Sequence, residues 1–324
     1  MTDPFDGEAL PATGTAHGHV RLKNGLLARI AYAHEGDPTA AARLNLQAEA
    51  FRYLQPAGCT PRLHEVIAPR PGLPGGALIV DFIDGHPPRL PGELDTMAET
   101  LAAIHALPLP PATSPIPRQT DPFGQTLAAV EPLVARFLDK AVPDADARAE
   151  IVEELGLVRA LASTLDRATQ PLTVALADTH SGNFIVDRHG TAWFVDLEKV
   201  HVGSPAIDLA HATLPTSTLW HPDVGVLLTG EQVQAFYDDY LALLPREKAL
   251  ALAPWLMPMR RLTWLRTTLF MARWRVETRS PRDPSNPGQW SDAGLEPRMK
   301  RHIDARIDRC FGVDAIRAIR REWL

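Results

Sequence analysis

The chain has little cysteine and no long apolar run. Only two of its 324 residues are cysteine, Cys59 and Cys310, and their wide separation gives no metal-ligand spacing. A disulfide framework is therefore not expected, and a reducing cytoplasm is the simplest location. No apolar stretch approaches the length of a membrane span, and no basic-then-apolar signal segment begins the chain. We expect neither a membrane partner nor a secreted protein.

An excess of positive charge is also missing. The sequence has 33 Lys and Arg against 39 Asp and Glu, a net charge of −6, and lysine occurs only at positions 23, 140, 199, 248 and 300. Nucleic-acid binding calls for a basic footprint, so a nucleic-acid partner is not expected. The nucleotide-binding Gly-Lys-Ser/Thr motif is absent as well. The hydrophobic content of 45% is enough to bury a sizeable core, with room for two lobes.

Local signals in the first third of the chain predict strands and one helix. An Asn24-Gly25 pair, a strong hairpin signal, separates apolar runs over 19–23 and 26–32. The small-residue segment 13–18 precedes this hairpin and is compatible with phosphate binding by backbone N–H groups or with a plain surface turn. The other elements expected here are a helix over 39–54 and strands over 62–67 and 76–83.

Helical spacing of apolar residues is typical of most of the remaining chain. The expected helices cover 93–106, 125–140, 145–168, 231–244, 249–275 and 296–323. Two prolines, Pro254 and Pro258, are expected to interrupt the fifth of these helices. The Pro-rich segment 106–121 is expected to be an irregular surface connection.

Polar residues at distinctive spacings mark the segment 174–209. Asp178 and, five residues later, Asn183 lie between apolar runs that predict short strands, with a turn over 187–190. Asp196 and Glu198 end the second strand, and Asp208 follows. Each residue alone suits an ordinary turn. Together and in this order they indicate a hairpin with acids at its mouth.

This set of side chains matches the needs of phosphoryl transfer. The reaction requires positioning and charge neutralisation more than covalent chemistry. An Asp beside the acceptor hydroxyl orients it and accepts its proton, while an Asn oxygen and a second Asp suit Mg²⁺, which prefers oxygen ligands. Asp178 fits the first role, and Asn183 and Asp196 fit the metal-binding roles.

At these residues the sequence resembles the aminoglycoside phosphotransferase and choline kinase-like family of small-molecule kinases. The family's catalytic loop commonly reads His-Gly-Asp-Leu-His-Pro-Gly-Asn, and residues 176–183 read Leu-Ala-Asp-Thr-His-Ser-Gly-Asn. The resemblance implies an α+β, two-lobed, protein-kinase-like fold. A small antiparallel sheet with one helix would form the N-terminal nucleotide-binding lobe (1–84), and a mainly helical lobe (85–324) would carry catalysis and acceptor binding. It also implies that Asp208 braces the catalytic loop. We expect His180 to order this loop rather than to act as a base.

The same resemblance implies a site for ATP or GTP. Arg29 on a strand, paired with Glu49 on the helix, would hold the nucleotide phosphates, and a hinge over 81–85 that includes Asp81 and Ile83 would meet the base. Arg29 replaces the Lys usual in the family, and Leu176 replaces the usual His. Because a planar guanidinium and a compact ammonium differ in geometry, the first change is not conservative.

Two functions follow from these residues. The leading hypothesis is a kinase that moves the γ-phosphate of ATP or GTP to a hydroxyl of a small molecule. The alternative is a weak or inactive relative that binds a nucleotide or metabolite as a regulatory module, which the changes at Arg29 and Leu176 would favour. Retention of Asp178, Asn183 and Asp196 favours activity, because clustered carboxylates need a cation.

The acceptor and the oligomeric state are left open by the sequence. The C-terminal region offers Trp and Arg side chains as candidates for a pocket wall, although Trp at helical spacing is more often core. This mixture argues against a polycationic acceptor and leaves sugars, amino alcohols and acidic metabolites open. The residues concerned are Trp255, Arg260, Arg261, Trp264, Arg266 and Trp274.

Overall fold

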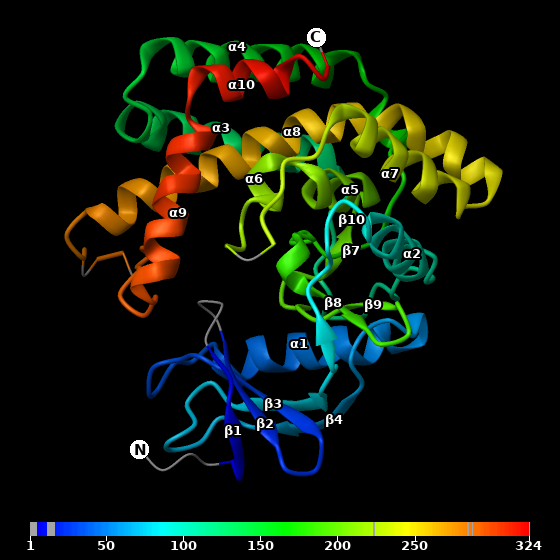
Figure 1. Cartoon of the computed structure of the whole chain (residues 1–324), viewed down its shortest axis with the longest axis vertical. Helices are drawn as coiled ribbons and strands as arrows, with labels where there is room; N and C mark the ends of the chain where they lie inside the picture. Colours follow the sequence, from blue (N-terminus) through cyan, green and yellow to red (C-terminus); the bar gives the residue numbers. More distant parts are fainter. Residues whose placement is uncertain (1–4, 12–16, 223, 284, 287, 324) are drawn as a thin grey trace.

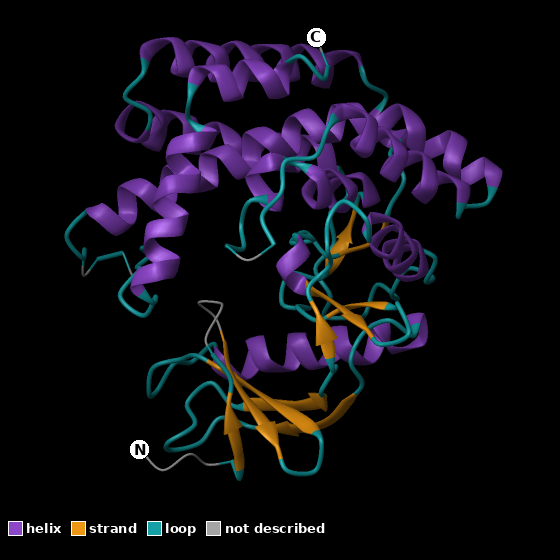
Figure 2. Cartoon of the chain, viewed as in Figure 1, coloured by secondary structure: helices purple, strands orange, loops and turns teal. Residues whose placement is uncertain are grey.

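The computed structural model describes residues 5–11, 17–222, 224–283, 285–286 and 288–323. Strands gather in the N-terminal part of the chain and helices dominate the rest (Figures 1 and 2). Residues 13–16, the greater part of the small-residue segment 13–18, lie outside the described residues. Its last two residues, His17 and Gly18, belong to a strand.

Five antiparallel strands form the N-terminal sheet, in the order β1-β2-β3-β5-β4. Their bounds are β1 Gly7–Ala9, β2 His17–Leu22, β3 Leu26–Ala31, β4 Leu63–Ile67 and β5 Ala77–Asp81. The predicted hairpin is confirmed, with His19 opposite Arg29 in the β2–β3 register. Gly25 has φ of +81°, a conformation that glycine adopts without steric cost. The exposed strand β1 has no apolar pattern and was not predicted.

One helix, α1 (Ala40–Leu54), packs against β4 and β5 of this sheet. It confirms the helix predicted over 39–54. Leu44, Phe51 and Leu54 are buried, as helical spacing requires for a one-sided core. A short 3₁₀ turn follows and ends at Gly58, whose φ is +72°. The helix lies between the N-terminal sheet and the rest of the molecule (Figure 1).

Two smaller sheets carry the central motif. β6 (Gly85–His86), β8 (Phe184–Asp187) and β9 (Ala192–Phe194) form an antiparallel sheet, and β7 (Thr173–Ala175) pairs with β10 (His201–Gly203). The β8–β9 hairpin and its turn confirm the predicted hairpin. Since β5 ends at Asp81 and β6 begins at Gly85, the chain crosses between sheets within the predicted hinge. The exact division into lobes at residue 84 stays a prediction.

Helices form the remainder of the molecule (Figure 2). Their bounds are α2 Leu94–His105, α3 Pro122–Ala141, α4 Ala145–Thr164, α5 Pro205–Thr213, α6 Pro215–Thr218, α7 Gly230–Ala242, α8 Arg246–Arg279, α9 Pro297–Cys310 and α10 Val313–Arg320. The Pro-rich segment between α2 and α3, all of it described, has no helix or strand of its own, as predicted. Among the described residues, no helix is long and apolar enough to cross a membrane.

Helix α8 differs from its prediction. It runs unbroken for 34 residues with Pro254 and Pro258 inside it, although each proline removes one backbone hydrogen bond. Its buried side packs against α3 and α5, and Trp255, Met259 and Leu262 are among its buried residues. Pro254 lies on the exposed side, where water can satisfy the carbonyl left without a donor. Burial of one continuous stripe therefore outweighs the local helix-breaking effect.

Candidate active site

The predicted catalytic loop (176–183) leaves the buried strand β7 and enters β8 through a 3₁₀ turn at Ser181–Asn183. Leu176 is fully buried, so the residue that replaces the family's His serves as core. The next residue, Ala177, has φ of +60°. This turn of the backbone directs the chain away from the buried strand toward Asp178.

Asp208 holds the loop in place from helix α5. Its carboxylate accepts hydrogen bonds of 2.7 Å from the backbone N–H groups of both Leu176 and Ala177. His105 donates from Nε2 to the same carboxylate at 3.0 Å, and Thr179 Oγ donates to the Asp208 carbonyl oxygen at 2.6 Å. Asp208 is fully buried. The bracing contact that the family resemblance implies is therefore present.

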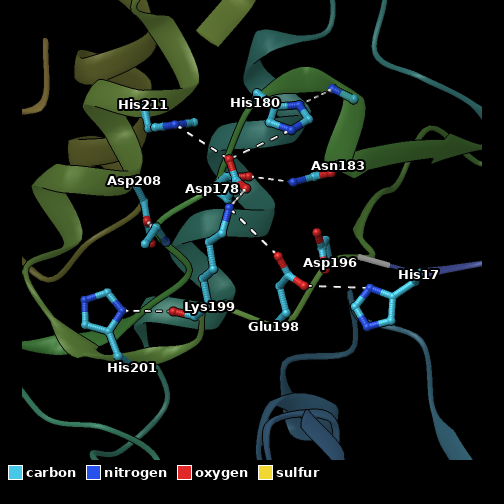
Figure 3. Close-up of polar contacts among 12 residues, drawn as sticks. His17, Asp178, His180, Asn183, Asp196, Glu198, Lys199, His201, Asp208 and His211 are labelled. Carbon is cyan, nitrogen blue, oxygen red and sulfur yellow. Dashed lines mark hydrogen bonds and ion pairs between the residues drawn. The ribbon is translucent and has the colours of Figure 1, made fainter. Parts of the chain in front are cut away.

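Asp178 lies at the centre of a ring of cationic and imidazole groups (Figure 3). Lys199 forms an ion pair with Oδ2 of Asp178, and the Nε2 atoms of His180 and His211 lie 3.9 and 3.7 Å from Oδ1. Burial would raise the pKa of Asp178, but His180 and Lys199 outweigh burial and hold that pKa below its ordinary value. Burial lowers the pKa of His211 to about 3. At neutral pH the carboxylate is thus ionised beside a neutral imidazole.

Asn183 and Asp196 lie beside this carboxylate and offer oxygen donors. Asn183 donates from Nδ2 to the Asp178 carbonyl oxygen at 2.8 Å, and no described hydrogen bond uses its amide oxygen. The Val195 N–H donates to the Asn183 carbonyl at 3.0 Å, which fixes Asp196 next to the loop. Among the described residues, no cluster of three or more His, Cys, Asp or Glu side chains could hold a metal alone. This sparse, oxygen-only set fits Mg²⁺, which keeps waters and phosphate oxygens as ligands.

Arg29 connects the N-terminal sheet to this hairpin. It donates from Nη1 to the Val195 carbonyl at 2.9 Å and forms an ion pair with Asp196. Burial would raise the pKa of Asp196, but Arg29 outweighs burial and lowers that pKa. Arg29 thus contacts the second of the two predicted metal-binding residues.

The pair predicted between Arg29 and Glu49 is not formed in the described structure. Glu49 lies 3.9 Å from Arg52 on its own helix, and its side chain is 35% exposed. The apolar spacing in α1 did not show which face of this helix lies toward Arg29. Gln47 faces that side instead. A nucleotide role for Glu49 stays a prediction without structural support.

His17 is a member of the site that the sequence did not reveal. Its Nε2 donates to Gln47 of α1 at 3.1 Å, and its Nδ1 accepts from Arg29 at 3.2 Å. Burial, assisted by the charge of Arg29, lowers the pKa of His17 to about 3. Its Nδ1 also lies 3.7 Å from Glu198, as Figure 3 shows. A lone histidine in a strand carries no sequence signal for such a contact.

The predicted hinge residues lie between the two sheets. The Asp81 carboxylate accepts hydrogen bonds from the Arg62 N–H at 3.0 Å and is 2.7 Å from His64 Nε2. Asp81 thereby fastens the end of β5 to β4, and its N–H donates to the Arg62 carbonyl. Ile83 is half-buried in the crossing segment. Contact of either residue with a nucleobase stays a prediction.

Most of the C-terminal Trp and Arg residues belong to the core. Trp255 and Trp264 are buried. Arg260 binds Glu322 and Thr213, and Arg261 binds Glu154. These contacts support the core interpretation for these four residues.

A different tryptophan, Trp220, lies nearer the catalytic loop. Its ring centroid is 6.0 Å from that of His180, and the Arg306 guanidinium lies 4.4 Å above the Trp220 ring. Neither residue belongs to a motif or a spacing that would single it out in the sequence. Trp220 and Arg306 therefore extend the surroundings of Asp178 beyond His180.

The sequence of this chain matches the APH family model, described as the phosphotransferase enzyme family, over residues 20–250. The chain therefore belongs to the phosphotransferase enzyme family. The prediction of a small-molecule kinase agrees with this class. No curated protein matches the chain in sequence.

Solved structures of similar fold include proteins named as small-molecule kinases or phosphotransferases. A choline/ethanolamine kinase family protein from Mesorhizobium loti is 18% identical, with 94% of each chain covered and a TM-score of 0.56. Plasmodium vivax ethanolamine kinase is 14% identical over 97% of this chain and 84% of its own, with a TM-score of 0.58. The ADP-bound aminoglycoside phosphotransferase APH(2'')-Ib is 12% identical over 95% and 93%, with a TM-score of 0.56. The predicted α+β protein-kinase-like fold is confirmed.

Proposed function

We propose that this enzyme transfers the γ-phosphoryl group of ATP or GTP to a hydroxyl group of a small molecule. One observation carries the proposal. The Asn183 side chain donates to the Asp178 carbonyl oxygen, and the Asn183 carbonyl accepts from the N–H of Val195, the residue before Asp196. These contacts hold Asp178, Asn183 and Asp196 at one end of the β8–β9 hairpin, beside a cation from the opposite sheet. A carboxylate for the acceptor and oxygen donors for a metal therefore face the same small volume.

Asp178 acts on the acceptor in this proposal. The acceptor hydroxyl donates to the ionised carboxylate, and its oxygen attacks the γ-phosphorus. The bond from that phosphorus to the nucleoside diphosphate breaks, and its electron pair leaves with the diphosphate. The hydroxyl proton moves to Asp178, which later loses it to water. Such general-base assistance contributes about 10²–10⁴-fold in rate.

Asn183 and Asp196 would hold Mg²⁺ through the amide oxygen and the carboxylate. When bound, the metal neutralises charge on the phosphate oxygens. Arg29 would steady the phosphates from the sheet side, and the segment that contains Asp81 and Ile83 would meet the base. The ADP-bound state of one structural neighbour supports a nucleotide as co-substrate.

The acceptor in this proposal is a small hydroxylated molecule. The structural neighbours are named for choline, ethanolamine and aminoglycosides. Near Asp178 this chain presents aromatic and cationic groups, with Trp220 beside His180 and Arg266 beside Phe270, 4.7 Å from its ring centroid. These groups favour acceptors with less positive charge than an aminoglycoside.

Turnover of nucleotide with a panel of acceptors tests the proposal. Sugars, amino alcohols and hydroxy acids would be offered with Mg²⁺ and either ATP or GTP, and phosphorus NMR would follow the products. We expect at least one acceptor to yield a phosphate ester and nucleoside diphosphate in equal amounts. Asp178→Ala should lower this rate by about 10²-fold or more while nucleotide binding persists. A variant that keeps the wild-type rate would contradict the role of Asp178.

A further inference from the structure

A lysine that belongs to no predicted motif contacts the proposed base. Lys199 follows the hairpin directly, and its ammonium forms an ion pair with Oδ2 of Asp178. The same nitrogen lies 3.9 Å from Oε1 of Glu198. The Lys199 carbonyl oxygen is 3.1 Å from His201 Nδ1, which helps to fix its backbone. Figure 3 shows the side chain extending from below toward Asp178.

The other cation of the site is held much more firmly. Arg29 has a side chain that is 6% exposed and is fixed by a backbone carbonyl as well as by Asp196. The Lys199 side chain is 46% exposed, and the described contacts of its ammonium are only with the carboxylates of Asp178 and Glu198. Lysine has a long flexible stem with a compact charge. Lys199 can therefore change partners without disturbing the core.

Lys199 also lies where the reaction needs positive charge. Its ammonium contacts Asp178, where the proposed acceptor would bind. It also lies near Glu198, which is two residues after Asp196, a proposed metal ligand. The transferred phosphoryl group must pass between the acceptor hydroxyl and the nucleotide, and its charge is spread over the equatorial oxygens. A cation placed between these two sides would meet those oxygens rather than the α- or β-phosphate.

We propose that Lys199 leaves Asp178 when a nucleoside triphosphate binds and donates hydrogen bonds to the γ-phosphoryl oxygens during transfer. This inference rests on the proposed function. Lys199 keeps all of its protons and only exchanges hydrogen-bond acceptors, so the bonds made and broken are those of the transfer itself. Its departure also frees Oδ2 of Asp178 to accept the hydrogen bond of the acceptor hydroxyl. Lys199 is thus both a phosphoryl-binding cation and a cover for the base in the absence of nucleotide.

Binding of two nucleotides to Lys199→Met tests this inference. Calorimetry with Mg²⁺ would compare ADP with the non-hydrolysable β,γ-imido analogue of ATP, because only the analogue has a γ-phosphoryl group. We expect the variant to lose about 10- to 100-fold in affinity for the analogue, the worth of a charge-assisted hydrogen bond. Its affinity for ADP should change little. Retained ADP binding would also show that the variant is folded.

Two further variants control the experiment. Lys199→Arg keeps the charge and should recover part of the lost affinity for the analogue. Lys140→Met changes an exposed lysine at the end of α3 and should affect neither nucleotide. An equal loss for both nucleotides, or no loss for either, would overturn the role of Lys199. Failure of the wild-type protein to bind either nucleotide or its guanine counterpart would instead overturn the proposed function on which this inference rests.

Discussion

At the scale of single residues, Ala177 carries a backbone conformation that side chains disfavour. Its φ of +60° lies in the left-handed region, which costs a residue with a Cβ atom about 1–2 kcal/mol. The positions of both neighbouring residues are constrained, since Leu176 packs in the core and Asp178 is the proposed base. The strain is retained because Asp208 accepts the Ala177 N–H.

Glycine at this position should relieve the strain. Part of the gain is offset, because glycine loses about 0.5–1 kcal/mol more conformational entropy on folding. We therefore expect Ala177→Gly to raise the free energy of unfolding by about 1 kcal/mol or less, measured by urea denaturation. Ala175→Gly is the matched control, since Ala175 lies in the regular strand β7, and it should destabilise the protein. A clear destabilisation by Ala177→Gly would contradict the assignment of strain.

At the scale of secondary-structure elements, one carboxylate joins α5, α2 and the catalytic loop. Asp208 accepts two backbone N–H groups and His105 Nε2, and it is inaccessible to solvent. Replacing Asp208 by Asn keeps the shape of the side chain but replaces one carboxylate oxygen with an NH₂ group. This NH₂ group would then face an N–H donor of the protein. A buried donor without an acceptor is costly.

Asp208→Asn should therefore destabilise the protein and disorder the loop. We expect a loss of about 2–3 kcal/mol in the free energy of unfolding, measured by urea denaturation. Turnover should fall as well, because the loop positions Asp178. Asp238→Asn, on the exposed side of α7, is the control and should change stability little. Equal stabilities of the two variants would show that Asp208 does not brace the loop.

The secondary-structure elements divide into those with local signals and those without. The Asn24-Gly25 turn and the apolar spacing of α1 determine elements through short-range chemistry, and both were predicted. The continuity of α8 across Pro254 and Pro258 depends on packing against α3 and α5. Short segments such as β1 and α6 contain too few residues to show a period. Local pattern therefore predicts elements well until tertiary packing overrides it.

The residues of the candidate site also divide into those with a local sequence signal and those without one. The order and spacing of Asp178, Asn183 and Asp196 predicted that these residues meet, because one hairpin and its loop carry all three. The Arg29–Glu49 pair required knowledge of how α1 rotates on the sheet, and the structure has Gln47 on that face. The roles of His17 and Lys199 arise from contacts across the fold, which single residues in a sequence do not reveal.

At the scale of the whole molecule, buried histidines make folding sensitive to acid. Burial lowers the pKa of both His17 and His211 to about 3, while an unfolded histidine has a pKa near 6.5. Below pH 6.5 these two histidines bind protons in the unfolded chain but stay neutral in the folded chain. Stability is therefore present above that pH and is lost as the pH falls toward the folded-state pKa values.

The free energy of unfolding should thus decrease between pH 7 and pH 5. Each histidine that stays neutral contributes a slope of about 1.4 kcal/mol per pH unit. His17→Gln should make the free energy of unfolding depend less steeply on pH. The control variant His189→Gln, at an exposed position, should have the same pH dependence as the wild-type protein. Urea denaturation at several pH values measures these slopes. A wild-type stability that does not change over this range would contradict the burial of neutral imidazoles.

Arg29 contributes to the junction between the N-terminal sheet and the β8–β9 hairpin through its contacts with Val195 and Asp196. The proposed function requires that a metal-bound nucleotide lie at this junction. The most direct test is calorimetric titration of ATP and GTP, with and without Mg²⁺, into the wild-type protein and Asp196→Ala. The account predicts that Mg²⁺ strengthens nucleotide binding to the wild-type protein and that Asp196→Ala abolishes this gain. Absence of nucleotide binding, or binding indifferent to both the metal and Asp196, would contradict it.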